Sequence, residues 1–138
     1  MSHVLVDEDG VGGGVVDHLA CKGFVGASSP IRDEQGEQNL GYKVNYQNMR
    51  SQAYYTLAEY ANQHKIAVST ENTEYRQFIT EELEQIKAKD ADVDGKLKII
   101  GKDEIKEFLG RSTDFADCLA MRMWFELDKT PVPGIRLL

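Results

Sequence analysis

Apolar positions near the start of the chain predict a strand, a helix and a second strand in succession. The run Val4, Leu5 and Val6 is short and rich in β-branched residues, as strands are, and turn-forming residues follow it. Residues 15–20 carry apolar side chains at helical spacing, and residues 24–27 predict the second strand. Because the two strands are joined through a helix, we expect them to pair in parallel with a right-handed crossover.

The rest of the chain predicts mainly helices. Residues 28–44 are polar and contain glycine, which indicates a long loop, and helical periodicity then covers about residues 46–64 and 70–87, with Thr70 as the N-cap of the second helix. The pattern also predicts an extended piece over 66–68, a strand over 96–100, a short helix over 103–109 that Gly110 ends, and a last helix capped by Ser112. We therefore expect an α/β fold with a short, mostly parallel sheet flanked by helices.

Length and composition fit one folded domain. The chain has 138 residues, of which 41% are hydrophobic and 28% charged, so a core can form and wholesale disorder is excluded. No apolar run reaches the roughly 20 residues that a membrane span needs, and the N-terminus lacks the pattern of a signal peptide. Two cysteines are too few for a disulfide framework or a zinc site. We expect a cytoplasmic protein with reduced thiols and no membrane partner.

Charge is distributed unevenly along the chain. The formal net charge is −7, which argues against binding of nucleic acid by bulk attraction to phosphate. Residues 1–95 carry a net charge of −8, however, whereas residues 96–138 carry +1. Any contact with a polyanion is therefore expected on the C-terminal segment.

Asp7 is the first candidate site residue, because it stands at the end of the first predicted strand. Ligands of α/β sheets collect at the carboxyl ends of strands, and a carboxylate there suits a hard cation such as Mg²⁺. The plainer interpretation is a turn aspartate that only shapes the loop. The glycines that follow, Gly12 to Gly14, also allow a nucleotide-binding loop, but the Gly-Lys-Ser/Thr pattern and the third glycine of the dinucleotide fingerprint are missing.

Asp114 and Asp117 form the second candidate. They lie three residues apart at the start of the last predicted helix, so their side chains share one face. Stabilisation of the helix dipole explains one such acid without any function, whereas two are also a platform for a divalent metal. Together with Asp7 they would form a carboxylate cluster, and two metals held by such a cluster can activate water and stabilise the leaving oxygen in phosphodiester cleavage.

A basic stretch leads into this acidic pair. Its members are candidates for contact with a DNA backbone that approaches the acids, although a solvated face is the plainer interpretation. They are Lys96, Lys98, Lys102, Lys106 and Arg111. The aromatic residues Tyr54, Tyr55, Tyr60 and Trp124 are predicted as core.

Three motifs, in the family's order along the chain, resemble the nuclease domain of phage terminase large subunits. Residues 4–19 resemble its strand and glycine-rich turn, and residues 46–55 are similar to its Asn-x-Arg helix. Residues 100–106 and 109–119 resemble its closing motif, Lys-x-Glu-ϕ-Lys followed by Gly-Arg-Ser-Pro-Asp-x-Ala-Asp-Ala-Leu. Thr113 and Cys118 stand where the family commonly has Pro and Ala, and neither change removes a carboxylate. The resemblance runs from residue 4 to about residue 127.

The resemblance implies a partial ribonuclease H-like fold and Mg²⁺- or Mn²⁺-dependent cleavage of concatemeric double-stranded DNA during genome packaging. Asp7 would match the second catalytic acid and Asp114 the third, with Asp117 a further ligand or supporting acid. Lys98, Lys102, Lys106 and Arg111 would contact DNA. The family's partners are an ATPase portion, a small terminase subunit and a portal protein.

One departure from the family shapes the expected activity. The family fold opens with strands that carry the first catalytic aspartate, after an ATPase motor, whereas this chain starts at what resembles a later strand. We therefore expect residues 1–128 to be the C-terminal part of a nuclease domain, weakly active or inactive alone, with a tail over 129–138. An uncovered sheet would favour self-association. Two alternatives stay open, a non-catalytic interaction module with a remnant of this fold and a small nucleotide-binding protein.

Overall fold

The computed structural model describes residues 4–10, 12–32, 44–90 and 95–128. In the first part, strand β1 (Leu5–Asp7) and strand β2 (Lys22–Phe24) pair in parallel, with Asp7 opposite Phe24, and helix α1 (Gly12–Leu19) connects them. The predicted parallel strand–helix–strand unit is therefore confirmed. The tail predicted over 129–138 lies outside the described residues.

Gly12 explains how this turn closes. A Cβ atom at this position would overlap the carbonyl oxygen of Asp7, so only glycine lets α1 start directly against the end of β1. The second strand lies two residues earlier than the sequence predicts. Phe24 is its last residue, and the N–H of Gly26 donates instead to the Asp9 carboxylate at 3.1 Å, which takes the chain out of the ladder.

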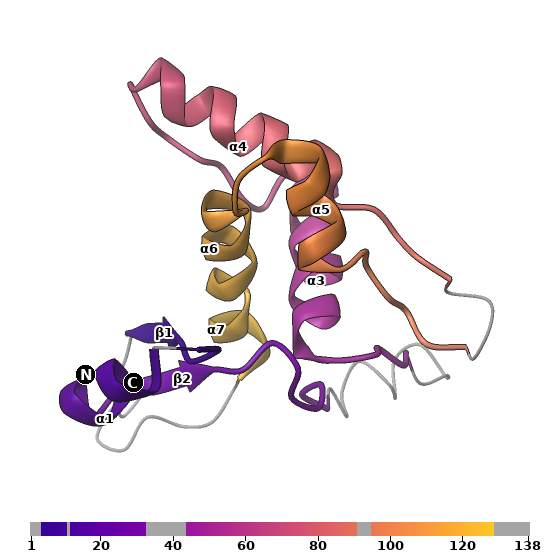
Figure 1. Ribbon diagram of the computed structural model, residues 1–138. Coiled ribbons are helices and arrows are strands. Elements are labelled where there is room, and N and C mark those ends of the chain that lie inside the picture. Colours follow the sequence, from indigo (N-terminus) through magenta and orange to yellow (C-terminus); the bar gives the residue numbers. More distant parts are fainter. Residues whose placement is uncertain (1–3, 11, 33–43, 91–94, 129–138) are drawn as a thin grey trace, which may run out of the picture.

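The remaining helices form a packed group beside this unit. They are α3 (Met49–Asn62), α4 (Thr73–Gln85), α5 (Lys102–Leu109), α6 (Asp114–Arg122) and α7 (Trp124–Leu127). Figure 1 shows α3 and α6 side by side, with α4 and α5 toward one end and the strands toward the other. The α/β fold that the sequence predicts is thus present, with a short parallel sheet flanked by helices.

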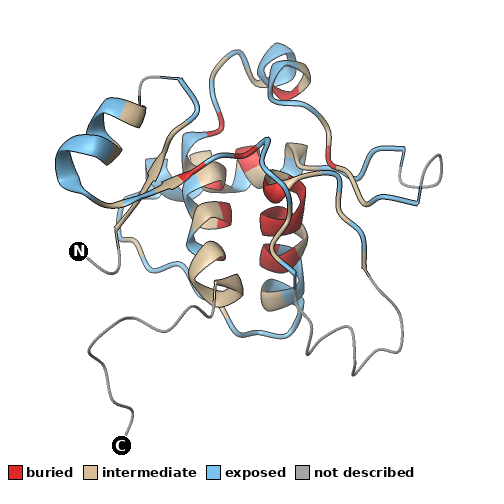
Figure 2. Cartoon of the chain, turned by 90° about the horizontal axis from the view of Figure 1, so that it is seen from below, coloured by how far each residue is buried: buried red, intermediate tan, exposed pale blue. Residues whose placement is uncertain are grey.

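The core lies between α3 and α6. The buried residues among those described concentrate in these two helices, as the red segments of Figure 2 show, and they include most of the first half of α3. Ala53 of α3 and Ala116 and Ala120 of α6 are at most 2% exposed, and their small side chains let the two helix backbones approach closely. Met49 and Met123, whose flexible side chains fill irregular spaces, belong to the same buried cluster.

Several local predictions are corrected by the structure. The segment 96–100, predicted as a strand, forms only isolated bridges, Tyr46 to Leu97 and Ala88 to Ile99. Each neighbouring segment pairs with it through a single residue, so no continuous strand forms. Residues 66–68 join no sheet among the described residues.

The helix caps also differ from prediction. Asn72 and not Thr70 caps α4, since its side-chain oxygen accepts hydrogen bonds from the N–H groups of Glu74 and Tyr75. Thr113 and not Ser112 stands at the N-cap of α6, and α7 follows as a separate turn of helix. Gly110 ends α5 in the left-handed conformation, with φ of 70°, as predicted. No helix in the described ranges is long and apolar enough to cross a membrane.

Candidate functional site

Asp7 is placed at the carboxyl end of β1 by the tight turn into α1. Its Oδ1 accepts the N–H of Asp9 at 3.1 Å, an Asx-type turn that fixes the side chain locally. Its Oδ2 lies 3.7 Å from Nζ of Lys102, and the side chain is 41% exposed. The carboxylate is thus oriented toward α5 and still reachable from solvent.

Asp117 is surrounded by polar groups from α3, from α5 and from the N-cap of its own helix. Its Oδ1 accepts the hydroxyl of Tyr54 at 2.7 Å, and its Oδ2 accepts the hydroxyl of Thr113 at 3.0 Å. Nζ of Lys102 lies 3.5 Å from Oδ2, and Nε of Arg50 lies 4.0 Å from Oδ1. Both oxygens are therefore partnered within the chain, and the carboxylate is held in one orientation.

Tyr54 is the most strongly perturbed acid of this site. Burial raises the pKa of its phenol well above the usual value near 10, and the neighbouring Asp117 carboxylate raises that pKa further. The hydroxyl consequently stays protonated and remains a donor to Asp117 at any ordinary pH. Tyr54 belongs to the core, as predicted, but its hydroxyl also belongs to the site.

Lys102 connects the two carboxylates. Its ammonium lies within 4 Å of Asp7 and of Asp117, and its side chain is 46% exposed. Lys102 is the first residue of α5, where the helix dipole disfavours a cation, so the two acids offset an unfavourable position. The ammonium marks the point between Asp7 and Asp117 at which positive charge is stabilised.

An open hollow of about 400 Å³ lies over this point. Asp7, Asp114 and Asp117 all line it, together with Lys102 and Lys106. Asp114 is the first residue of α6 and is exposed. The three acids that the sequence singles out thus come from two distant segments to one hollow.

The described residues do not form a closed metal cage. Within those residues, no group of three or more His, Cys, Asp or Glu side chains is arranged to hold a metal ion. Two carboxylates beside an open, water-accessible hollow nevertheless fit the way Mg²⁺ binds proteins, through one or two carboxylates with waters and phosphates completing the shell. The donor set fits one divalent cation whose shell a ligand completes.

The predicted DNA contacts have different surroundings. Lys102 and Lys106 line the hollow. Lys98 lies on an extended segment, and its backbone carbonyl oxygen accepts a hydrogen bond from the Tyr55 hydroxyl at 3.4 Å. Arg111 is engaged inside the chain, where it donates to Glu82 and lies 4.4 Å from the ring centroid of Phe78. The Glu82 carboxylate raises the pKa of this guanidinium.

Sequence reasoning missed Arg50 as a member of the site. Its Nη1 donates to the carbonyl of Ile100 at 2.9 Å, while its Nε and Nη2 are buried without a hydrogen-bond partner in the described part of the chain. The guanidinium lies 5.2 Å from the Tyr54 ring centroid. A usable signal was the four-residue spacing of Arg50 and Tyr54, which puts both on one face of α3.

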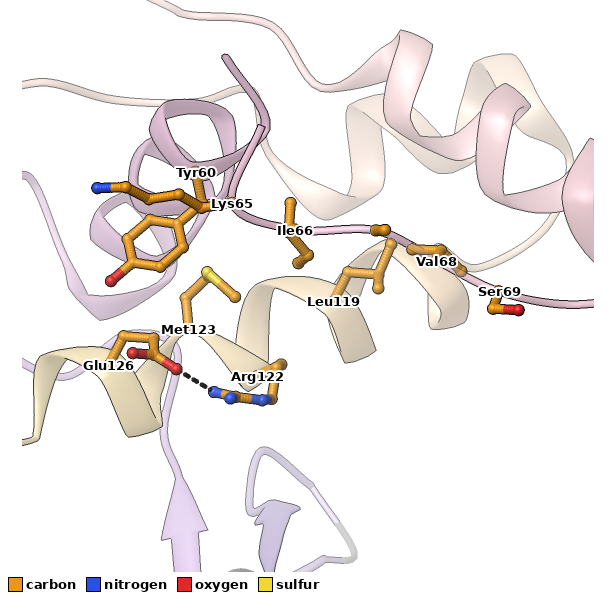
Figure 3. Close-up of a pocket in the computed structure, with 10 residues that line it drawn as sticks. Tyr60, Lys65, Ile66, Val68, Ser69, Leu119, Arg122, Met123 and Glu126 are labelled. Carbon is orange, nitrogen blue, oxygen red and sulfur yellow. Dashed lines mark ion pairs between the residues drawn. The ribbon is translucent and has the colours of Figure 1, made fainter. Parts of the chain in front are cut away.

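A second hollow, of about 350 Å³, lies against a different face of α6 (Figure 3). Ile66, Leu119 and Met123 line it with apolar surface, and Arg122 pairs with Glu126 at 2.9 Å beside it. It holds one acid, already paired, and none of the predicted site residues. The hollow between β1, α5 and α6 is therefore the candidate site.

Comparison with known proteins bears on the fold of the chain. No protein-family model and no curated protein matches the chain. Among solved structures, the nuclease domain of the large terminase subunit gp2 of bacterial virus Sf6 matches with 27% identity and a TM-score of 0.67, over 93% of this chain and 65% of that one.

A lysine-to-alanine mutant of the same domain, with manganese, matches with 27% identity and a TM-score of 0.65, over 86% of this chain and 64% of that one. The chain thus spans slightly less than two thirds of the solved domains. The resemblance to phage terminases is confirmed: in sequence and in fold, the chain is similar to the nuclease domain of a terminase large subunit, and it matches part of that ribonuclease H-like fold.

Proposed function

We propose that this chain is the C-terminal part of a terminase-type nuclease that cleaves concatemeric double-stranded DNA in a metal-dependent reaction during genome packaging. One observation carries the proposal: in a chain similar to a terminase nuclease domain, four acids, among them Asp7, Asp114 and Asp117, line one open hollow together with two lysines. Such a role belongs in the host cytoplasm, beside the ATPase portion, the small subunit and the portal.

Asp7 and Asp117 are proposed to hold a divalent cation, Mg²⁺ or Mn²⁺, with Asp114 at the margin of the hollow. When bound, the cation supplies a Lewis acid that activates water and stabilises the leaving oxygen of a phosphodiester. Manganese accompanies one of the similar solved domains, which supports this class of ion. Lys102 is 46% exposed, so its ammonium can turn away from the acids when a cation approaches.

The residues around the proposed cation site have separate roles. Tyr54 and Thr113 hold Asp117 by hydrogen bonds of 2.7 and 3.0 Å, which orients its carboxylate before any ligand arrives. Lys102 and Lys106 face the hollow and would bind the DNA backbone phosphates. The proposed site thus combines carboxylates that would bind the cation with lysines that would bind phosphate.

The activity of the chain by itself is proposed to be weak or absent. Two of the three acids converge on a common cation, Lys102, and this provides ligands for one metal ion more readily than for two. Cleavage by a two-metal mechanism needs both ions. Robust Mn²⁺-dependent cleavage of a plasmid, lost in Asp114→Ala, would overturn this proposal of inactivity and support the nuclease assignment.

Calorimetric titration with Mn²⁺ tests the site directly. We expect saturable binding that Asp7→Asn and Asp117→Asn each weaken at least about tenfold, since each removes one of two charged ligands. Asp103→Asn is the matched control, because Asp103 lines the same hollow from α5 but is not one of the two carboxylates that Lys102 contacts, Asp7 and Asp117. Equal affinity in all three variants would exclude a cation site at Asp7 and Asp117.

A second candidate is a non-catalytic interaction module that retains the fold. It is favoured by the state of Asp117, whose oxygens are both partnered by groups of the chain, and by the two-stranded sheet of the described residues, which leaves strand edges for another chain. Absence of Mn²⁺ binding, together with a dimer in analytical ultracentrifugation, would support this candidate over the nuclease.

A further inference from the structure

Glu82 of α4 is a glutamate with no exposed surface, and the scheme above gives it no task. We propose that Glu82 is a positioning residue: it caps the N-terminus of α6 from a neighbouring helix and so orients Asp114 and Asp117 toward Asp7. This inference rests on the proposed function, because it assigns Glu82 to the same site.

The N-terminus of α6 lacks a cap of its own. A threonine at the N-cap ordinarily accepts a hydrogen bond from one of the first helical N–H groups. Thr113 makes no such bond, because its hydroxyl donates to Oδ2 of Asp117 at 3.0 Å. The Thr113 hydroxyl thus contacts the site through Asp117 and does not cap the helix.

Glu82 takes over the missing function. Its Oε2 accepts the N–H of Ala116 at 2.8 Å, the third helical position of α6, where an N-cap side chain would otherwise bind. Ala116 has no exposed surface, so water does not replace this acceptor. A carboxylate at this end of the helix also interacts favourably with the helix dipole.

Arg111 holds the carboxylate in place. The guanidinium donates to Oε1 of Glu82 and to Oε2 of Glu81 at 3.3 Å, and it stacks on the ring of Phe78. Arg111 lies in the segment just before α6, whereas Glu81 and Glu82 lie on α4. The pair therefore ties the start of the acid-bearing helix to α4, over a separation of 29 residues.

The position of Asp117 is consequently fixed from two sides. Glu82 binds Ala116, the residue next to Asp117 in sequence, while Tyr54 of α3 binds the carboxylate itself. A rotation of α6 would break both contacts together. Asp114 lies on the same first turn, so the cap sets its direction as well.

Two variants of the full chain separate capping from simple filling of the core. Glu82→Gln keeps an oxygen acceptor for Ala116, whereas Glu82→Leu keeps volume and removes the acceptor. Capping predicts that Mn²⁺ affinity and protection of the Ala116 amide from hydrogen exchange fall in the order wild type, Gln, Leu, with a loss of about tenfold in the last. Filling of the core predicts that Leu retains both.

Glu81→Gln is the matched control. Glu81 neighbours Glu82 and binds the same Arg111, yet no hydrogen bond joins it to α6 in the described part of the chain. We expect its Mn²⁺ affinity and amide protection to stay within about twofold of wild type. A loss equal to that of Glu82→Gln would mean that the charge on Arg111 matters and not the cap, which overturns the proposal.

If the single variants unfold, the double variant Glu82→Leu/Arg111→Met can still test the proposal. It removes both charges, and replacement of a buried ion pair by apolar residues commonly preserves folding. Recovery of the thermal midpoint with Mn²⁺ affinity still reduced supports positioning, whereas recovery of both overturns it. If wild type itself binds no Mn²⁺, the proposed function fails, and the order of Ala116 amide protection still decides whether Glu82 caps α6.

Discussion

Replacement of Lys102 by alanine should strengthen binding of a divalent cation. The ammonium lies 3.7 Å from the Asp7 carboxylate and 3.5 Å from that of Asp117, so a metal ion has to displace it. The lysine side chain is 46% exposed, and ion pairs of this kind contribute about 0.2–1 kcal/mol each. Two pairs sharing one ammonium therefore oppose the metal by about 1 kcal/mol, which corresponds to roughly a fivefold change in affinity.

Isothermal titration with Mn²⁺ at low ionic strength measures this change. We expect Lys102→Ala to raise the affinity about fivefold and to lower the unfolding free energy without metal by about 1 kcal/mol, because two carboxylates lose their common cation. Lys106→Ala is the control, since Lys106 lines the same hollow one helical turn later. Unchanged or weaker Mn²⁺ binding in Lys102→Ala, or an equal gain in Lys106→Ala, would refute the reasoning.

Three further predictions concern stability. The raised pKa of Tyr54 means that, as pH rises, its phenol ionises in the unfolded chain before it ionises in the folded chain. The contribution of Tyr54 to stability is therefore retained below about pH 10 and falls above it, by up to about 1.4 kcal/mol per pH unit. Tyr54→Phe should reduce this alkaline loss in urea unfolding, and it should lower stability at neutral pH by about 1 kcal/mol because the hydrogen bond to Asp117 is lost. Gly12→Ala should disrupt the strand–helix–strand unit, seen as loss of amide protection in β1 and β2, because its methyl group would overlap a backbone carbonyl. Ile105→Ala should cost about 2–5 kcal/mol, whereas Phe108→Ser on the same helix should change stability by less than about 0.5 kcal/mol, since Ile105 has no exposed surface and Phe108 is 75% exposed.

Local signals predicted most of the elements. Helical periodicity identified α3, and Gly110 identified the end of α5, because helix formation and its termination depend on residues within a few positions. The strand predicted over 96–100 failed for the opposite reason. A strand exists only through its neighbours, and the neighbours of this segment are single residues distant in sequence.

The candidate site divides in the same way. The sequence indicated Asp7 as a candidate site residue from its place at the end of a predicted strand, and Asp114 and Asp117 from their spacing. Their role as metal ligands stays a prediction. Arg111 was predicted as a DNA contact, and in the structure its guanidinium donates a hydrogen bond to the buried carboxylate of Glu82. Charge alone does not distinguish a basic residue that faces solvent from one that pairs with a buried acid.

The sequence by itself determined which segments are helical, that α5 ends at Gly110, that the first two strands pair in parallel, and which carboxylates were available for chemistry. Only the tertiary structure decided which groups those carboxylates meet. Tyr54 reaches Asp117 across 63 residues and Glu82 reaches Ala116 across 34, and neither pairing leaves a periodic trace in the sequence. Hydrogen bonds between distant elements are set by helix packing, which depends on the shapes of all the side chains in the contact and not on local order along the chain.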